Sequence, residues 1–378
     1  MLEFKLPSLG ADMDEGRLLE WKVQPGDAVR KGQVVAVVDT SKAAVDVEIW
    51  QEGTIHELRV PPGEMIPVGT VLATLLPPGE AAPGPAPEPA ETPRPAGRVK
   101  ISPAARRRAQ ELGVDLATLT PRGPDGTLTL ADVERAAPRV TPEVAPVAPA
   151  APQTPAERVA ETRKAIAAAM GRSKREIPHY YLLETIPLGA ALAWLEATNA
   201  RRPITARLLL AALQIKAVAR ALAKFPDLNG FYRNERFEPA AAINPGVAIS
   251  LRQGGLIAPA LQNADQKPLD VLMGELADLV KRTRAGSLRS SEMSQATVTI
   301  TNLGDQGVEA VLGVIYPPQV ALVGFGKVTQ RPWVDQGQLG VMPTVTASLA
   351  ADHRVSDGHR GALFLAELGA LLQHPQDL

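Results

Sequence analysis

The stretch VVAVVDTSKAAVDVEIW, residues Val34–Trp50, contains two strand-like runs joined by the segment Asp39–Ala44. A tight hairpin usually has glycine or asparagine at its tip, because these residues tolerate a positive φ. Here the connection contains Lys42, flanked by small residues. Exposed lysines are common on protein surfaces, so the surroundings of this hairpin decide how Lys42 is interpreted.

An internal repeat surrounds the hairpin. GRLLEWKVQPGDAVRKGQVVAVV, which starts at Gly16, aligns with GTIHELRVPPGEMIPVGTVLATL, which starts at Gly53. Each copy has strand-like runs separated by a Pro-Gly turn and by a second glycine turn. We therefore predict an all-β domain over residues 1–76, a flattened sandwich or barrel of two quasi-repeats that presents Lys42 to solvent.

Proline divides the rest of the 378-residue chain. Many of its 35 prolines lie in residues 77–98 and 137–157. Segments rich in alanine and proline and without aromatic residues favour extended spacers over a packed core. Two further folded units are therefore predicted, over residues 99–136 and 158–378.

The two later units have different patterns. In residues 99–136, SPAARRRAQELG and TLADVERA carry helix-start signals and predict two short helices. Residues 158–378 alternate helical runs with short β-branched runs, which predicts an α/β domain. Its clearest predicted helices cover residues 205–225, 270–286 and 361–373, and its strands lie in GVAISL, ATVTITNLG, QVALVGFG and TVTASLAADH.

Charge and composition exclude several classes of function. The 40 Lys and Arg residues balance 41 Asp and Glu residues, so neither nucleic acid nor an anionic membrane is an expected partner. The absence of cysteine excludes disulfides, thiolate metal sites and a cysteine nucleophile, and no metal is expected. No apolar run approaches the roughly 20 residues of a membrane span. The opening MLEFKLPSLG has the alternation of a first strand rather than of a targeting segment, and a cytoplasmic location is expected.

The repeat and its lysine segment DTSKA resemble the lipoyl domains of 2-oxo acid dehydrogenase complexes. In those domains a lysine in such a turn carries the cofactor, so the resemblance implies a covalent lipoyl group on Lys42. Ser41 stands where aspartate is more usual. The related biotinyl domains have methionine on both sides of the lysine, whereas this chain has Ser41 and Ala43.

A second motif, AADHRVSDG at Ala350–Gly358, lies between a strand pattern and a helix pattern. A single histidine is more often structural than catalytic, but His353 is followed four positions later by Asp357 and a glycine. This pattern resembles the active-site motif of the acyltransferase components of the same complexes and of chloramphenicol acetyltransferases. RKAIAAAM, IPHYYL, GGLIAPAL, TITNLG and YPPQVALVGFG follow the family's order, which implies a chloramphenicol-acetyltransferase-like catalytic domain.

The resemblance implies a role for several residues. His353 would be the base that takes the proton of the coenzyme A thiol, whose ordinary pKa near 8.5 keeps it mostly protonated at neutral pH. Thr301 would donate to the developing oxyanion, and Asp357 would orient other groups. We predict that Arg163 holds Asp357, and that Arg163 and Asn302 are among the cofactor-binding residues. The family also implies a trimer whose active sites combine His353 of one chain with Thr301 of its neighbour.

The unit over residues 99–136 resembles a peripheral-subunit-binding domain. Arg106 and Arg107 would then bind acidic surfaces of dihydrolipoyl dehydrogenase or of a thiamine-diphosphate-dependent 2-oxo acid decarboxylase. The alternative is a solvated helix face. Thr127 replaces a basic residue that often contributes to docking in the family.

The sequence therefore predicts an acyltransferase that moves an acetyl group from dihydrolipoyl-Lys42 to coenzyme A within a pyruvate dehydrogenase complex. Branched-chain, succinyl and acetoin-complex acyltransferases remain alternatives. So does a function of another class, a non-catalytic lipoyl-bearing scaffold, although a scaffold would be expected to lose the His-x-x-x-Asp-Gly pattern. The sequence leaves open whether trimers form a 24- or 60-chain core and which partner the middle unit prefers.

Overall fold

The structure is a computed structural model. It describes residues 1–9, 13, 15–40, 44–77, 100–101, 107, 109, 127–128, 155–251 and 255–378. The chain divides into two compact units, of which the first contains Met1–Ala82 together with Gln153–Leu378 and the second contains Pro83–Pro152.

The second unit is described at few positions. Strands β9 (Lys100–Ile101) and β10 (Thr127–Leu128) pair in parallel, and Arg107 and Ala109 are helical. Most of the two helices predicted for residues 99–136 therefore lies outside the described residues.

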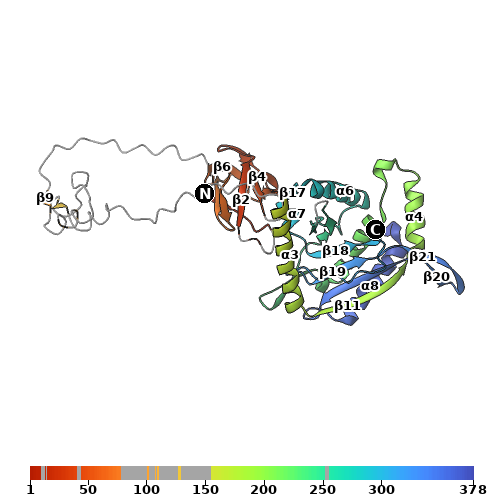
Figure 1. Cartoon of the computed structure of the whole chain (residues 1–378). Helices are drawn as coiled ribbons and strands as arrows, with labels where there is room; N and C mark the ends of the chain where they lie inside the picture. The colour runs from red at the N-terminus through yellow and green to blue at the C-terminus, as the bar shows by residue number, and fades with distance from the viewer. Residues whose placement is uncertain are drawn as a thin grey trace. The chain divides into compact units, whose positions relative to one another are not determined.

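The N-terminal part of the first unit forms the strands that the repeat predicts (Figure 1). The first copy forms β2 (Glu15–Trp21), β3 (Ala28–Val29) and β4 (Gln33–Asp39), and the second forms β6 (Gly53–Leu58), β7 (Met65–Pro67) and β8 (Val71–Leu76). β1 (Leu2–Lys5) precedes both copies and β5 (Ala44–Ile49) lies between them. Gly26 and Gly63 occupy equivalent turns with φ of 97° and 96°, a conformation that favours glycine.

The two copies exchange their short strands. One sheet has the order β1-β8-β6-β3, and the other contains β5-β4-β2-β7. Thus β3 of the first copy pairs with β6 of the second, and β7 of the second pairs with β2 of the first. Leu18, Val38, Leu72 and Leu75 are fully buried in one core, so both copies contribute to the same core.

The C-terminal part is built on a mixed sheet with the order β11-β21-β19-β18-β14. These strands are β11 (His179–Pro187), β21 (Gln338–Asp352), β19 (Ala321–Phe325), β18 (Val298–Asn302) and β14 (Pro245–Val247). β20 (Thr329–Asp335) pairs with the first half of β21 and forms a hairpin that extends the sheet. Figure 1 shows helix α8 (Gly358–Gln373) lying along β11 and β21.

The other helices of this part are α3 (Pro155–Glu176), α4 (Gly189–Asn199), α5 (Leu210–Lys224), α6 (Leu269–Ala285) and α7 (Ser290–Ser294). Short strands are β12 (Gly230–Arg233), β13 (Arg236–Pro239), β15 (Ile249–Ser250), β16 (Leu256–Ile257) and β17 (Leu288–Arg289). The 3-10 turns are η3 (Ile204–Ala206), η4 (Pro226–Leu228), η5 (Gly304–Gln306) and η6 (Pro375–Asp377). In the core, Phe225 meets Phe364 of α8 edge to face, with ring centroids 5.9 Å apart.

The predicted helix over residues 205–225 was too long at its start. Helix α5 begins at Leu210, because Leu208 is held outside the helix by Asn199. The Asn199 side chain accepts from the Leu208 N–H at 2.8 Å and donates to the Leu208 carbonyl at 2.9 Å. This contact joins residues nine positions apart, which a local pattern does not reveal.

Among the described residues, no helix is both long enough and apolar enough to cross a membrane.

Candidate active site

His353 is the first residue after β21 and lies shortly before α8. Its backbone N–H donates to the Pro178 carbonyl at 3.0 Å, which fixes the chain at this point. Its ring meets the edge of Tyr180 at 5.3 Å between centroids, with 70° between the planes. The side chain is exposed, and its ring makes no hydrogen bond within the described part of the chain. The His353 ring is therefore open to solvent, where an imidazole can exchange a proton with an incoming group.

A second histidine, His179, has no such freedom. Its Nδ1 donates to the Ile177 carbonyl at 2.9 Å, and its Nε2 accepts from the Ile315 N–H at 3.1 Å. Both ring nitrogens are therefore occupied in the neutral form. Burial lowers the pKa of His179, since it disfavours the charged imidazolium. His179 therefore has a structural role, whereas the His353 ring makes no hydrogen bond among the described residues.

The residues on either side of His353 form an ion pair with each other, in which Asp352 is buried and Arg354 is partly exposed. Asp352 is fully buried and accepts from the Arg354 backbone N–H at 3.0 Å, from Nε at 2.9 Å and from Nη2 at 2.6 Å. These hydrogen bonds to Asp352 raise the pKa of Arg354 above its usual range. The guanidinium also lies 3.9 Å from the ring centre of Tyr232. The loop that carries His353 is therefore anchored on both sides.

We expect Asp352→Ala to lower the free energy of unfolding by about 2–3 kcal/mol, because it leaves the Arg354 donors without their acceptor. The estimate is below that for a fully buried pair, since the Arg354 side chain is 31% exposed. Urea unfolding of the purified chain measures the loss. Asp335→Ala, at the exposed end of β20, is the matched control and should change stability by less than about 0.5 kcal/mol. Equal stability of the two variants would contradict this role of Asp352.

Asp357 is the N-cap residue of α8. Its carboxylate accepts from the Arg360 N–H at 3.0 Å. This hydrogen bond is the largest cause of a lowered pKa, and the His359 N–H and the charges of His359 and His353 act in the same direction. Asp357 is therefore ionised at neutral pH, where it stabilises the helix start.

Tyr180 is a site residue that the sequence analysis did not identify. Its hydroxyl is 2.8 Å from the Ser356 hydroxyl, and its ring contacts His353. Burial raises the pKa of Tyr180, so the phenol stays protonated. The aromatic pair in IPHYYL was the only signal, and nothing local in the sequence indicates its contact with residues more than 170 positions away.

Thr301 and Asn302 lie at the end of β18. The Thr301 side chain is partly buried, and its hydroxyl makes no hydrogen bond with any residue that the structure describes. The Asn302 side chain is hydrogen-bonded at both ends, since its Nδ2 donates to the Gln214 side chain at 2.8 Å and its Oδ1 accepts from the Gly304 N–H at 2.9 Å. Within the described residues, the Thr301 hydroxyl therefore remains available as a donor.

The strand register separates Thr301 from His353 within one chain. Thr301 is level with Gly324 of β19, and Gly324 is level with Ser348 of β21. His353 follows Ser348 by five residues, which corresponds to about 16 Å along a strand. The two residues therefore lie toward opposite ends of the sheet in a single subunit.

The other predicted site residues are placed as follows. Arg163 is an exposed residue of α3, and no ion pair joins it to Asp357 among the described residues. Arg107 is exposed, whereas Lys42 and Arg106 lie outside the described residues. The strands that flank Lys42 are ordered, since Asp39 of β4 pairs with Ala44 of β5.

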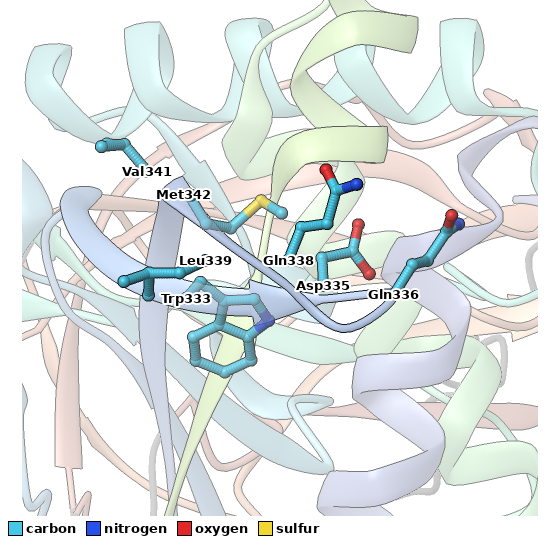
Figure 2. Close-up of a pocket in the computed structure, with 8 residues that line it drawn as sticks. Trp333, Asp335, Gln336, Gln338, Leu339, Val341 and Met342 are labelled. Carbon is cyan, nitrogen blue, oxygen red and sulfur yellow. The ribbon is translucent and has the colours of Figure 1, made fainter.

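Two open pockets lie in the C-terminal part. One, of about 620 Å³, is close to the histidine loop and is lined by Arg172, Glu176, Ile177, Tyr232, Arg233, Asn234, Glu235, Pro317, Pro318, Gln319 and Arg354. The other lies on the hairpin formed by β20 and β21, where Figure 2 shows Trp333, Leu339, Val341 and Met342. Leu339 and Val341, two positions apart on strand β21, are 76% and 77% exposed, so this hairpin presents two large apolar side chains to solvent.

Three family models match the chain. The model described as 2-oxoacid dehydrogenases acyltransferase (catalytic domain) matches residues 151–378. The model described as biotin-requiring enzyme matches residues 2–75, and the model described as e3 binding domain matches residues 99–134. Each of the three folded units predicted from the sequence therefore has a matching model.

Relatives agree with these models. The dihydrolipoyllysine-residue acetyltransferase component of the pyruvate dehydrogenase complex of Staphylococcus aureus is 30% identical, with 99% of this chain and 98% of the relative covered. A solved dihydrolipoamide acetyltransferase of Azotobacter vinelandii, studied for the roles of a serine, a histidine and an asparagine in its catalytic mechanism, is 29% identical. It covers 57% of this chain and 89% of its own, with a TM-score of 0.54.

A further solved structure is the cubic core of a pyruvate dehydrogenase multienzyme complex. It is 28% identical, covers 57% of this chain and 90% of its own, and has a TM-score of 0.54. Since the acyltransferase model covers more than half of the residues, and a relative of 30% identity covers nearly the whole chain, the chain belongs to the 2-oxoacid dehydrogenase acyltransferase family.

Proposed function

We propose that this protein is the acetyltransferase component of a pyruvate dehydrogenase complex and passes an acetyl group from dihydrolipoyl-Lys42 to coenzyme A. One observation carries the catalytic assignment. Thr301 precedes His353 by fifty-two positions, and Asp357 follows it by four. The serine, histidine and asparagine studied in the Azotobacter vinelandii enzyme have the same two spacings. Thr301 and Asp357 stand where that enzyme has serine and asparagine. Threonine keeps the hydroxyl of serine, and aspartate keeps a side-chain oxygen where asparagine has its amide oxygen.

The mechanism follows from the chemistry of these side chains. A lipoyl group on Lys42 supplies the thiol that carries the acyl group. His353 takes the proton of the coenzyme A thiol as the sulfur of coenzyme A attacks the thioester carbonyl. Thr301 donates to the carbonyl oxygen as negative charge develops there. When the carbon–sulfur bond to the carrier breaks, the protonated His353 returns the proton to the departing sulfur.

We propose that the site forms between subunits of a trimer. The separation of Thr301 from His353 in one chain favours this arrangement, as does the exposure of His353. The exposed Leu339 and Val341 on the hairpin provide an apolar surface that a neighbouring subunit would bury. The ion pair between Arg163 and Asp357, and cofactor binding by Arg163 and Asn302, remain predictions for the assembled site.

Subunit complementation tests this proposal. We expect Thr301→Ala to lower the transfer rate by about 10²-fold, and His353→Ala to lower it further. Co-expression of the two variants should restore about a quarter of the wild-type rate, because one interface in four of a random trimer combines an intact His353 with an intact Thr301.

The control is co-expression of His353→Ala with the variant that carries both substitutions, which has no intact interface. Recovery there, or no recovery in the first mixture, would contradict a site shared between subunits. Both outcomes are measured with acetyl-CoA and free dihydrolipoamide.

We further propose the division into a lipoyl domain (1–76), a linker (77–98), a peripheral-subunit-binding domain (99–136), a second linker (137–157) and a catalytic domain (158–378). The last three residues of the second linker belong to helix α3, which begins at Pro155. The spacers would let the Lys42 arm visit several active sites at high effective concentration. The middle domain would bind dihydrolipoyl dehydrogenase or the thiamine-diphosphate-dependent decarboxylase through Arg106 and Arg107. A cytoplasmic location is the simplest setting for such a complex.

A further inference from the structure

Within the unit formed by Met1–Ala82 and Gln153–Leu378, the N-terminal domain pairs with an edge of the C-terminal part. Strand β5, which directly follows the connection containing Lys42, forms a parallel ladder with β17. Leu288 is level with Val45, and Arg289 is level with Asp46. The four-stranded sheet β5-β4-β2-β7 thus gains a fifth strand from the C-terminal part, which is the geometry of strand addition.

Glu48 is the main polar contact of this pairing. Its N–H donates to the Ser290 hydroxyl at 3.0 Å, and its carboxylate accepts from the Ser291 N–H at 3.1 Å and from the Ser290 hydroxyl at 3.4 Å. Glu48 is only 6% exposed. A buried carboxylate is costly unless it is hydrogen-bonded, and here two of the three bonds reach Oε2 of Glu48.

An apolar contact accompanies the polar ones. Leu288 is fully buried within the core of the C-terminal part. Met293 packs against the core of the N-terminal domain and also against the core of the C-terminal part. A flexible methionine that bridges two cores suits a surface that must form and release contacts.

The segment that pairs with β5 is held by contacts within the C-terminal part. Arg282 of α6 makes two hydrogen bonds to the Glu292 carboxylate, at 2.5 and 2.6 Å. Glu292 also accepts from the Arg289 N–H at 2.9 Å. The segment Leu288–Ser294, which we call the docking edge, therefore keeps its shape without the N-terminal domain.

We propose that the docking edge is a reversible binding site for the domain that carries Lys42, and that Glu48 is the residue it recognises. While docked, this domain is held at its own catalytic part and is withheld from the other components of the complex. Two ladder pairs and three hydrogen bonds make a small interface, so the contact depends on the tether, which supplies an effective concentration in the millimolar range. The docking itself does not depend on the proposed acetyl transfer, although its consequence for the arm rests on that function.

Amide hydrogen exchange on the full chain tests the proposal. The Glu48 N–H is the diagnostic group, because its acceptor is the Ser290 side chain of the other part. We expect exchange in the β5 peptide to be about threefold faster in Ser290→Asp than in wild type, as a docked fraction of two-thirds would produce. The introduced carboxylate would face Glu48 and repel it.

A charge swap provides the second variant. Glu48→Lys should also speed exchange, and Glu48→Lys combined with Ser290→Asp should slow it again, because opposite charges then meet. Glu52→Lys, an exposed glutamate of the same domain, is the matched control and should leave exchange unchanged. Equal exchange in wild type and Ser290→Asp, or no rescue by the charge swap, would overturn the docking site.

Transfer from acetyl-CoA to free dihydrolipoamide is measured on the same proteins. We expect Ser290→Asp to keep the wild-type rate, since free dihydrolipoamide needs no docked domain. If wild type and Ser290→Asp exchange at the same rate while both transfer acetyl groups, the docking site alone is overturned. If they exchange at different rates but the wild-type chain transfers no acetyl group, the proposed function alone is overturned.

Discussion

Replacement of Lys42 by arginine is expected to abolish the conversion of pyruvate to acetyl-CoA by the reconstituted complex. Lipoylation requires an ε-amino group that forms an amide, and a guanidinium keeps the charge but does not provide that nucleophile. The acetyl group then has no carrier between active sites. Transfer from acetyl-CoA to free dihydrolipoamide should be unchanged, because that reaction bypasses the arm.

Intact-mass measurement shows whether the lipoyl increment is lost, and overall flux shows the consequence. Lys31→Arg is the matched control, since Lys31 is an exposed lysine in a turn of the same domain. It should keep both the increment and the flux. Retention of overall flux by Lys42→Arg would mean that another residue carries the acyl group.

Replacement of His353 by alanine is expected to lower the transfer rate by about 10²–10⁴-fold, which is the usual contribution of a general base. The loss should appear in kcat, with little change in KM for coenzyme A, because the imidazole acts on the reacting proton and contributes little to ground-state binding. The fold should survive, since the His353 side chain is exposed and makes no hydrogen bond within the described residues.

His374→Ala serves as the control for this prediction. His374 is exposed at the end of α8 and takes part in no contact of the site described above. Its loss should leave kcat unchanged. Near-normal kcat in a folded His353→Ala trimer would show that another group accepts the thiol proton.

The sequence predicted the N-terminal fold well, because its information is local and repeated. The turns with Gly26 and Gly63 appear in both copies and define the strands between them. The exchange of β3 and β7 between the copies was not predicted, since strand pairing between distant segments leaves no local pattern. The same reason explains the misplaced start of α5, which depends on the contact between Asn199 and Leu208.

The candidate site divides in a similar way. His353 and Asp357 form a short motif and were identified from the sequence. Tyr180 was missed, because its contact with His353 arises from the pairing of β11 with β21. The importance of Asp352 was also missed, since full burial of a carboxylate is a property of the packed sheet. The distance between Thr301 and His353 within one chain could not be predicted either, because it follows from the register of β18, β19 and β21.

Transfer of acyl groups from acetyl-, isobutyryl- and succinyl-CoA to free dihydrolipoamide by the purified wild-type chain tests the proposed activity. We expect rapid transfer from acetyl-CoA and much slower transfer from the other two donors. Preference for isobutyryl- or succinyl-CoA would keep the mechanism and change the complex to which the protein belongs. A folded trimer that transfers none of the three acyl groups would contradict the proposed acetyl transfer and favour a non-catalytic scaffold.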